Sequence, residues 1–171
     1  MTNPLILVAA AERVALWAAA AAQPRRRLNH NLHPQLADPV QRLLNALAPG
    51  TYIRPHRHGP GAWELFALLA GAAAVLIFDD EGRVLARSDL APGDVVEIAP
   101  RTWHSLVALA PETVVLEVKP GPYRAGEDKD FAVWAPPEGA SAAPALVAWM
   151  ERATPTTPLA EAGLLGYCAA P

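Results

Sequence analysis

Short apolar runs separated by turns rich in glycine and proline fill the middle of this chain. They predict strands over residues 51–55, 63–70, 73–79, 83–87, 94–98, 103–109 and 112–119. The segment FDDEGR at residues 78–83 places a glycine late between two such runs, as a hairpin turn does. Many short strands with turns of this kind are typical of a sandwich or a closed barrel, and their spacing fits a jelly roll.

The segments on either side of these runs have other patterns. We expect a helix at residues 9–22, an irregular segment or strand at 25–33, and a C-terminal helix at 145–153. The segment VQRLLNAL after Asp38 and Pro39 can form a short helix or a strand, because Asp followed by Pro is a usual helix opening. The tail TPTTPLAEAGLLGYCAAP has little periodicity, and we expect it to wrap the surface or to be partly disordered. We therefore divide the chain into an N-terminal helix that packs on the barrel (1–24), the barrel itself (25–139), and a C-terminal helix with its tail (140–171).

The apolar run LILVAAAERVALWAAAAAQP near the N-terminus has the composition of a signal peptide or a membrane span. No basic region precedes it, Glu12 and Arg13 interrupt it, and the cluster Arg25–Arg27 follows it. The uninterrupted apolar part is also too short to cross a bilayer. We therefore expect a helix whose Leu, Val and Trp face packs on the barrel, with a cleaved signal peptide as the alternative.

Length and charge are those of one domain without affinity for nucleic acid. The 171 residues can bury one core of ordinary size. The net charge of −3 gives no general attraction to nucleic acid. The single cysteine, Cys168, excludes an internal disulfide and fits a reducing compartment, so we expect a cytoplasmic protein. Because the N-terminal run is too short to cross a bilayer, we also expect no membrane partner.

Three histidines and one glutamate are the candidate chemistry. Successive side chains of a strand alternate between its faces, so His56 and His58 can point to the same place. The same alternation puts Glu64 on the apolar face of its run and His104 on the inner face of a later strand. A carboxylate on an apolar inner face is costly unless it is paired or binds a cation. We expect these four residues to hold a divalent metal, with an ion pair from Glu64 to Arg54 or Arg57 as the alternative.

The spacing of these residues resembles the cupin motifs. The first motif, G-x5-H-x-H-x5-E-x6-G, runs from Gly50 to Gly71. The second motif keeps its overall spacing from Gly93 to His104, but its interior departs: Pro100 is one position late, Thr102 stands near the expected glycine, and Ala108 replaces an asparagine. These departures leave the proposed ligands in place.

More narrowly, the chain resembles the WbuC family of cupin-fold metalloproteins over roughly residues 25–139. The stretches that carry this resemblance are RRRLNHNLH, DPVQRLLNAL, GTYIRPHRH, WELFALLAG, APRTWHSLVAL, EVKPGPY and DKDFAVWAPPEG. The resemblance implies a mainly β fold, the cupin double-stranded β-helix or jelly-roll barrel, with a bound metal. The association of that family with bacterial surface-polysaccharide gene clusters points weakly to sugar chemistry.

A ligand set of nitrogen and oxygen without thiolate suits Fe, Mn, Ni, Co or Zn. Two classes of function stay open for such a site. The first is a metal-dependent isomerase, epimerase, lyase or dioxygenase that acts on a small polar molecule such as a sugar derivative. The second is a non-catalytic module that binds a small molecule or a metal. We also expect a homodimer, because apolar faces at residues 5–17 and 146–149 would gain from burial.

Further residues are candidates for binding the small molecule. Alternation places Tyr52 and Arg54 on the face of His56, which makes Arg54 a cation for an anionic or hydroxyl-rich ligand, or else a partner for a nearby carboxylate. The resemblance adds Asn29 and Asn31, together with Arg27, as hydrogen-bonding residues. Lys119 and Tyr123 are candidates for the pocket rim, and Arg25–Arg27 form either a solvated turn or an anion site. The candidate acids and bases beside the metal are Tyr52, Glu97, Lys119 and Tyr123.

Overall fold

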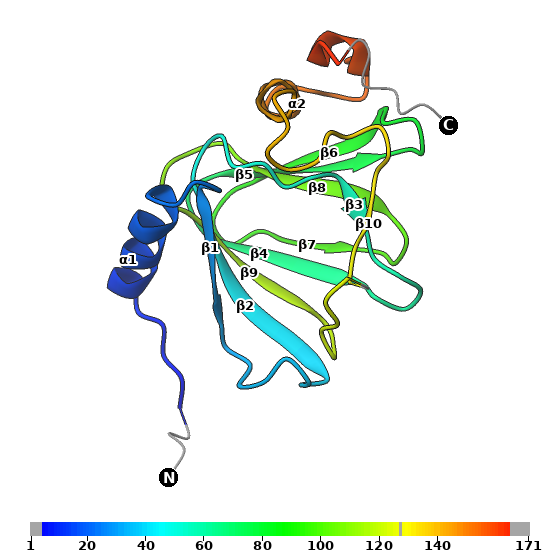
Figure 1. Ribbon diagram of the computed structural model, residues 1–171. Coiled ribbons are helices and arrows are strands. Elements are labelled where there is room, and N and C mark those ends of the chain that lie inside the picture. The colour runs from blue at the N-terminus through cyan, green and yellow to red at the C-terminus, as the bar shows by residue number, and fades with distance from the viewer. Residues whose placement is uncertain (1–4, 127, 165–171) are drawn as a thin grey trace.

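Two five-stranded antiparallel sheets face each other in the computed structural model, which describes residues 5–126 and 128–164 (Figure 1). The first sheet has the order β1 (Arg27–Asn31), β2 (Val40–Leu47), β9 (Thr113–Pro120), β4 (Glu64–Ala70) and β7 (Val95–Ile98). The second has the order β10 (Asp130–Phe131), β3 (His56–Arg57), β8 (Trp103–Ala108), β5 (Ala73–Phe78) and β6 (Val84–Leu90).

Strands that follow one another in the chain mostly lie in opposite sheets. β2 leads to β3, β4 to β5, β6 to β7 and β8 to β9, and each of these steps crosses from one sheet to the other. The four-strand order β2-β9-β4-β7 opposite β3-β8-β5-β6 is that of a jelly roll. The predicted mainly β jelly-roll barrel, with one helix before it and one after it, is confirmed.

The core lies between the two sheets and extends to the outer face of each. Between the sheets pack the inward side chains of both, among them Phe66, Leu68, Val75, Leu106 and Val115. Helix α1 (Ala10–Ala21) packs on the outer face of the first sheet, where Trp17 donates a hydrogen bond to the Leu47 carbonyl at 3.1 Å. Helix α2 (Ala143–Met150) covers the outer face of the second sheet (Figure 1). A helix thus covers part of the outer face of each sheet, and the inner faces form the core and the site.

Most of the predicted strands are present with ends shifted by a few residues. The segment VQRLLNAL is a strand and not a helix, because it pairs with β1 on one edge and with β9 on the other. The predicted strand at 51–55 is wrong: strand pairing begins only at His56. Side chains fix that segment instead, since Thr51 donates to the Arg25 carbonyl and Arg27 donates to the Tyr52 carbonyl.

The C-terminal tail is ordered as far as the structure describes it. A short 3₁₀ helix, η1 (Leu159–Ala162), packs against α2, and Trp149 donates a hydrogen bond to the Pro158 carbonyl at 3.0 Å. The rest of the tail, with Cys168, lies outside the described residues. Among the helices that the structure describes, none is long and apolar enough to cross a membrane.

Candidate metal centre

Four buried side chains meet at one place between the sheets. One potential ligand atom from each of His56, His58, Glu64 and His104 lies within 4.8 Å of the others. Glu64 comes from β4 in the first sheet, whereas His56 in β3 and His104 in β8 are register partners in the second sheet. His58 follows directly after β3. Two sheets and a connecting loop therefore build this cluster.

The three histidines are oriented by the backbone. Nδ1 of His56 lies 2.8 Å from the Arg54 carbonyl, and Nδ1 of His104 lies 2.9 Å from the Thr102 carbonyl. Nδ1 of His58 lies 2.5 Å from the Asp128 carbonyl, on the segment that follows β9. A carbonyl can only accept, so each Nδ1 carries the proton and each Nε2 is left to bind a cation. Backbone partners of this kind fix the tautomer and the ring orientation of metal-ligating histidines.

The remaining contacts in the cluster require a positive species. Nε2 of His56 and Nε2 of His58 are buried without a hydrogen-bond partner. Nε2 of His104 lies 2.9 Å from Oε2 of Glu64, and Nε2 of His58 lies 3.4 Å from Oε1 of Glu64. Because Nδ1 already holds the proton of each neutral ring, a nitrogen this close to a carboxylate needs an extra proton or a metal between the two. The donor set of three imidazoles and one carboxylate fits a divalent transition metal.

The ionisation of the cluster suits the same role. Burial lowers the pKa of His56 well below its usual value, and the charge of Lys129 lowers it further, so the ring is neutral as a ligand must be. Burial raises the pKa of Glu64, but the close contacts with Nε2 of His104 and Nε2 of His58 outweigh that effect and hold the pKa well below its usual value. The carboxylate is therefore charged although only 2 % of its side chain is exposed.

The alternative pairing for Glu64 is wrong. Arg57 pairs with Asp130 at 2.8 Å and lies over the ring of Trp103. The guanidinium of Arg54 donates to the Ala132 carbonyl and lies 5.1 Å from the centre of the Phe131 ring. Neither arginine is an ion-pair partner of Glu64, whose cationic neighbour is Lys119, with Nζ 3.8 Å from Oε1.

A charged group that the sequence did not lead us to expect lies beside the cluster of His56, His58, Glu64 and His104. Glu117, in β9, is buried and lies two residues before Lys119, whose Nζ is 3.1 Å from Oε1 of Glu117 and 3.0 Å from Oδ2 of Asp128. Asn45 in β2 donates to the other oxygen of Glu117. Burial and the charge of Glu64 raise the pKa of Glu117 to about 7. Alternation along VVLEVKP pairs Glu117 with Lys119 on one face, so the sequence did hold the signal.

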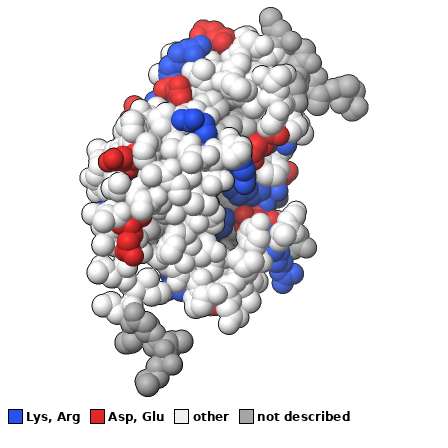
Figure 2. Space-filling view, turned by 60° about the vertical axis from the view of Figure 1, so that its left-hand side comes forward, with Lys and Arg blue, Asp and Glu red and all other residues white. Residues whose placement is uncertain are grey.

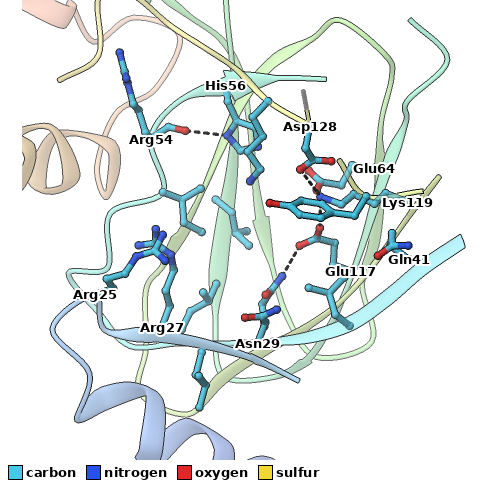
Figure 3. Close-up of a pocket in the computed structure, with 18 of the residues that line it drawn as sticks. Arg25, Arg27, Asn29, Gln41, Arg54, His56, Glu64, Glu117, Lys119 and Asp128 are labelled. Atoms are coloured by element: carbon cyan, nitrogen blue, oxygen red, sulfur yellow. Dashed lines mark hydrogen bonds and ion pairs between the residues drawn. The ribbon is translucent and has the colours of Figure 1, made fainter. Parts of the chain in front are cut away.

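A cavity of about 1150 Å³ opens from this cluster towards the N-terminal end of β1. Its wall is apolar at Leu43, Leu47, Ile53 and Leu106. Hydrogen-bonding and charged side chains make up much of the rest: Arg25, Arg27, Asn29, Asn31, His33, Gln41, Asn45, Arg54, Glu117, Lys119, Asp128, Lys129 and Glu138. Figure 3 shows Arg25 and Arg27 on one side and Glu64, Lys119 and Asp128 on the other. The space-filling view shows basic and acidic side chains gathered around a hollow in this surface (Figure 2).

Most of the residues predicted to bind the small molecule line this cavity, but not all of them do. Asn29, Asn31, Lys119 and Tyr123 line it. Arg54 also lines it, but its guanidinium is directed away from the histidines (Figure 3). The prediction that Tyr52 binds the ligand is wrong. Its ring packs in the apolar cluster under α2, and its hydroxyl donates a hydrogen bond to the Pro136 carbonyl at 2.7 Å. The expectation for Tyr52 fails because residues 51–55 are not a strand, so alternation does not extend back from His56.

Comparisons with known proteins give a partial family match and several similar folds. The model of a domain of unknown function, DUF6016, matches residues 10–90. No curated protein matches the chain.

Several solved structures are similar to this chain, each of the following three with a TM-score below 0.5. KdgF from Halomonas sp. is 23% identical, with a TM-score of 0.48 over 61% of this chain and 84% of that one. A cupin superfamily protein from Desulfitobacterium hafniense DCB-2 is 21% identical, with a TM-score of 0.47 over 58% of this chain and 81% of that one. Oxalate decarboxylase from Bacillus subtilis is 19% identical, with a TM-score of 0.48 over 63% of this chain and 32% of that one. The structural neighbours thus include cupin-superfamily proteins.

Proposed function

We propose that this chain is a cupin-fold metalloprotein, similar to the WbuC family. In this proposal it binds one divalent transition metal and is a metal-dependent enzyme. The ligands in this proposal are His56, His58, Glu64 and His104. The observation that carries it is the convergence of four buried potential ligand atoms, two of which, Nε2 of His56 and Nε2 of His58, have no hydrogen-bond partner. A bound Fe, Mn, Ni, Co or Zn ion would supply Lewis-acid chemistry to a carbonyl or hydroxyl oxygen.

The wall of the cavity favours a small polar molecule such as a sugar derivative. Asn29 and Asn31 project from β1, and Gln41 and Asn45 project from β2. The amide of Gln41 donates to the Leu36 and Asp38 carbonyls, which leaves its oxygen free to accept. Apolar side chains form another part of the wall. Hydroxyl groups need donors and acceptors together, and the C–H faces of a sugar ring pack on apolar surface.

Lys119 and Glu117 have a positioning role in this proposal. Lys119 bridges Glu117 and Asp128 and lies beside Glu64, so its one positive charge offsets part of the repulsion among these three carboxylates. Those carboxylates raise the pKa of Lys119 although burial opposes them, so the ammonium stays charged. With one oxygen held by Lys119 and the other by Asn45, Glu117 is fixed as a hydrogen-bond acceptor for a ligand hydroxyl.

Proton NMR of a panel of aldoses, ketoses, uronates and sugar phosphates tests the enzymatic function. The protein is loaded in turn with each of the five metals, and conversion is followed over hours. We expect at least one panel member to be converted by the wild type and not by His58→Ala, with His30→Ala as the matched control because His30 is exposed on β1. Line broadening of panel members without conversion at any metal would instead favour a non-catalytic binding module.

A further inference from the structure

Two arginines on the wall of the cavity share a single carboxylate. Nε of Arg25 lies 2.8 Å from Oε1 of Glu138, and Nη2 of Arg27 lies 2.9 Å from Oε2 of the same side chain. Arg25 also donates through Nη2 to Oε2 of Glu138. Two guanidiniums against one carboxylate leave one positive charge at this place.

Both guanidiniums keep donors for a second acceptor. Arg27 uses Nη1 for the Tyr52 carbonyl and the Thr51 hydroxyl, and Nη2 for Glu138. Arg25 uses Nε and Nη2 for Glu138. A guanidinium has five N–H donors in a planar fork that matches the oxygens of a carboxylate or phosphate. These contacts hold the two forks in place and leave part of each unengaged.

The cavity as a whole, like the pair of arginines, carries an excess of positive charge. Among the described residues that line it, the cations are Arg25, Arg27, Arg54, Lys119 and Lys129, and the carboxylates are Glu64, Glu117, Asp128 and Glu138. Five cations against four carboxylates leave an excess of one positive charge, and a divalent metal would raise it to three. A cavity lined by an excess of one sign raises the local concentration of oppositely charged ligands.

Strand β1 joins the arginines to the rest of the cavity. Arg27, Asn29 and Asn31 alternate along β1 and all line the cavity, so they lie on the same face of the sheet. At about 3.3 Å per residue, the four steps from Arg27 to Asn31 span about 13 Å. Asn29 lies opposite Asn45, which bonds to Glu117 near the metal cluster. A continuous row of hydrogen-bonding side chains thus runs from the arginines to the metal ligands.

We propose that Arg25 and Arg27 form an oxyanion subsite that binds a phosphate or carboxylate group at the end of the ligand remote from the metal. This proposal rests on the proposed function and deepens it: the substrate class becomes an anionic, hydroxyl-bearing molecule that spans the cavity. The volume of about 1150 Å³ is large for a neutral monosaccharide, since pockets for drug-sized ligands measure about 300–1,000 Å³.

Isothermal titration with matched probes tests the subsite. The probes are glucose, glucuronate, glucose 6-phosphate and inorganic phosphate, each titrated into metal-loaded wild type, Arg25→Gln, Arg27→Gln and Arg26→Gln. Arg26 is the matched control: its loss changes the net charge equally, but it is exposed, bonds to the Pro49 carbonyl and does not line the cavity. Because Arg27 also holds the Tyr52 carbonyl, Arg25→Gln, at an exposed side chain, is the variant that leaves the fold intact.

We expect the wild type to bind an anionic probe more tightly than glucose. Loss of one charge-assisted hydrogen-bonding group should weaken that binding about ten- to a hundredfold in Arg25→Gln, with Arg26→Gln unchanged. Glucuronate against glucose 6-phosphate decides between carboxylate and phosphate. No preference of the wild type for any anionic probe, or an equal loss in Arg26→Gln, overturns the subsite.

The same titrations in metal-free protein separate the subsite from the metal. If sensitivity to Arg25→Gln persists without metal, the subsite stands even where the metal proposal fails. If the protein binds metal but has no anion preference, only the subsite is wrong.

Discussion

Removing one candidate metal ligand should uncouple the stability of the fold from divalent metal. A ligand that binds only the native state stabilises it by about 2.7 kcal/mol when its concentration is a hundred times its Kd. For a chain of this size, 1 kcal/mol shifts Tm by about 2–4 °C, so the metal that fits best should raise Tm by about 5–11 °C. The three histidine rings are already oriented by backbone carbonyls, so little of this energy is lost to reorganisation.

His58→Ala removes one of the four ligand atoms. Loss of an outer partner of a metal ligand costs about ten- to a hundredfold in affinity, and we take the upper end for a direct ligand. At the same metal concentration the stabilisation then falls to about 0.4 kcal/mol, which is a shift of about 1–2 °C.

Differential scanning fluorimetry of metal-stripped protein, titrated with each metal, measures this shift within each variant. The shift in Tm is taken between the metal-free and metal-loaded forms of the same protein. A change in the metal-free Tm of His58→Ala therefore does not affect the comparison. His30→Ala, at an exposed position of β1, should keep the full wild-type shift. An undiminished shift in His58→Ala would refute the ligand assignment.

Three further predictions concern stability and assembly. Trp149→Ala should lower the free energy of unfolding by about 3–5 kcal/mol in urea titrations, because the ring is fully buried between α2 and the second sheet; a loss below 1 kcal/mol would contradict that packing. Hydrogen bonds and charge from Arg25 and Arg27 outweigh burial and lower the pKa of Glu138 below 4.5, so its stabilising contribution should be present above pH 4.5 and be lost as the pH falls through the lowered value. The difference in stability between wild type and Glu138→Gln in urea titrations should therefore be smaller at pH 3 than at pH 7; a constant difference would speak against the ion pair. The homodimer stays a prediction, now based on the exposed apolar side chains of Leu5, Ile6 and Leu7, and light scattering at the 18.1 kDa monomer mass would exclude it.

The barrel was predictable because its strands are short apolar runs between turns. Alternation placed Glu64 with Phe66 and Leu68, and both apolar side chains do lie in the core between the sheets. It failed where pairing is absent: β3 has two residues, so the expected face of Tyr52 did not follow from His56. The expected apolar interface at 146–149 also fails, since Leu146 and Trp149 are buried between α2 and the second sheet.

The residues of the candidate metal site were predictable from their spacing, but strand alternation does not fully explain why their side chains converge. His58 lies beyond β3, so alternation along a strand does not by itself aim its ring. The Asp128 carbonyl does so, from a loop seventy residues away whose contact with His58 no alternation along a strand predicts. Gln41 and Asn45 were missed because the segment after Asp38 and Pro39 could also be read as a helix, in which alternation has no meaning.

The most direct test of the central claim is the metal content of the protein purified without an affinity column. Inductively coupled plasma mass spectrometry should find close to one divalent transition metal per chain in the wild type and in His30→Ala. His58→Ala and Glu64→Gln should retain little of it after dialysis. A wild type that holds no metal after incubation with any of the five ions, or variants that retain the wild-type stoichiometry, would contradict the proposal that His56, His58, Glu64 and His104 form a metal centre.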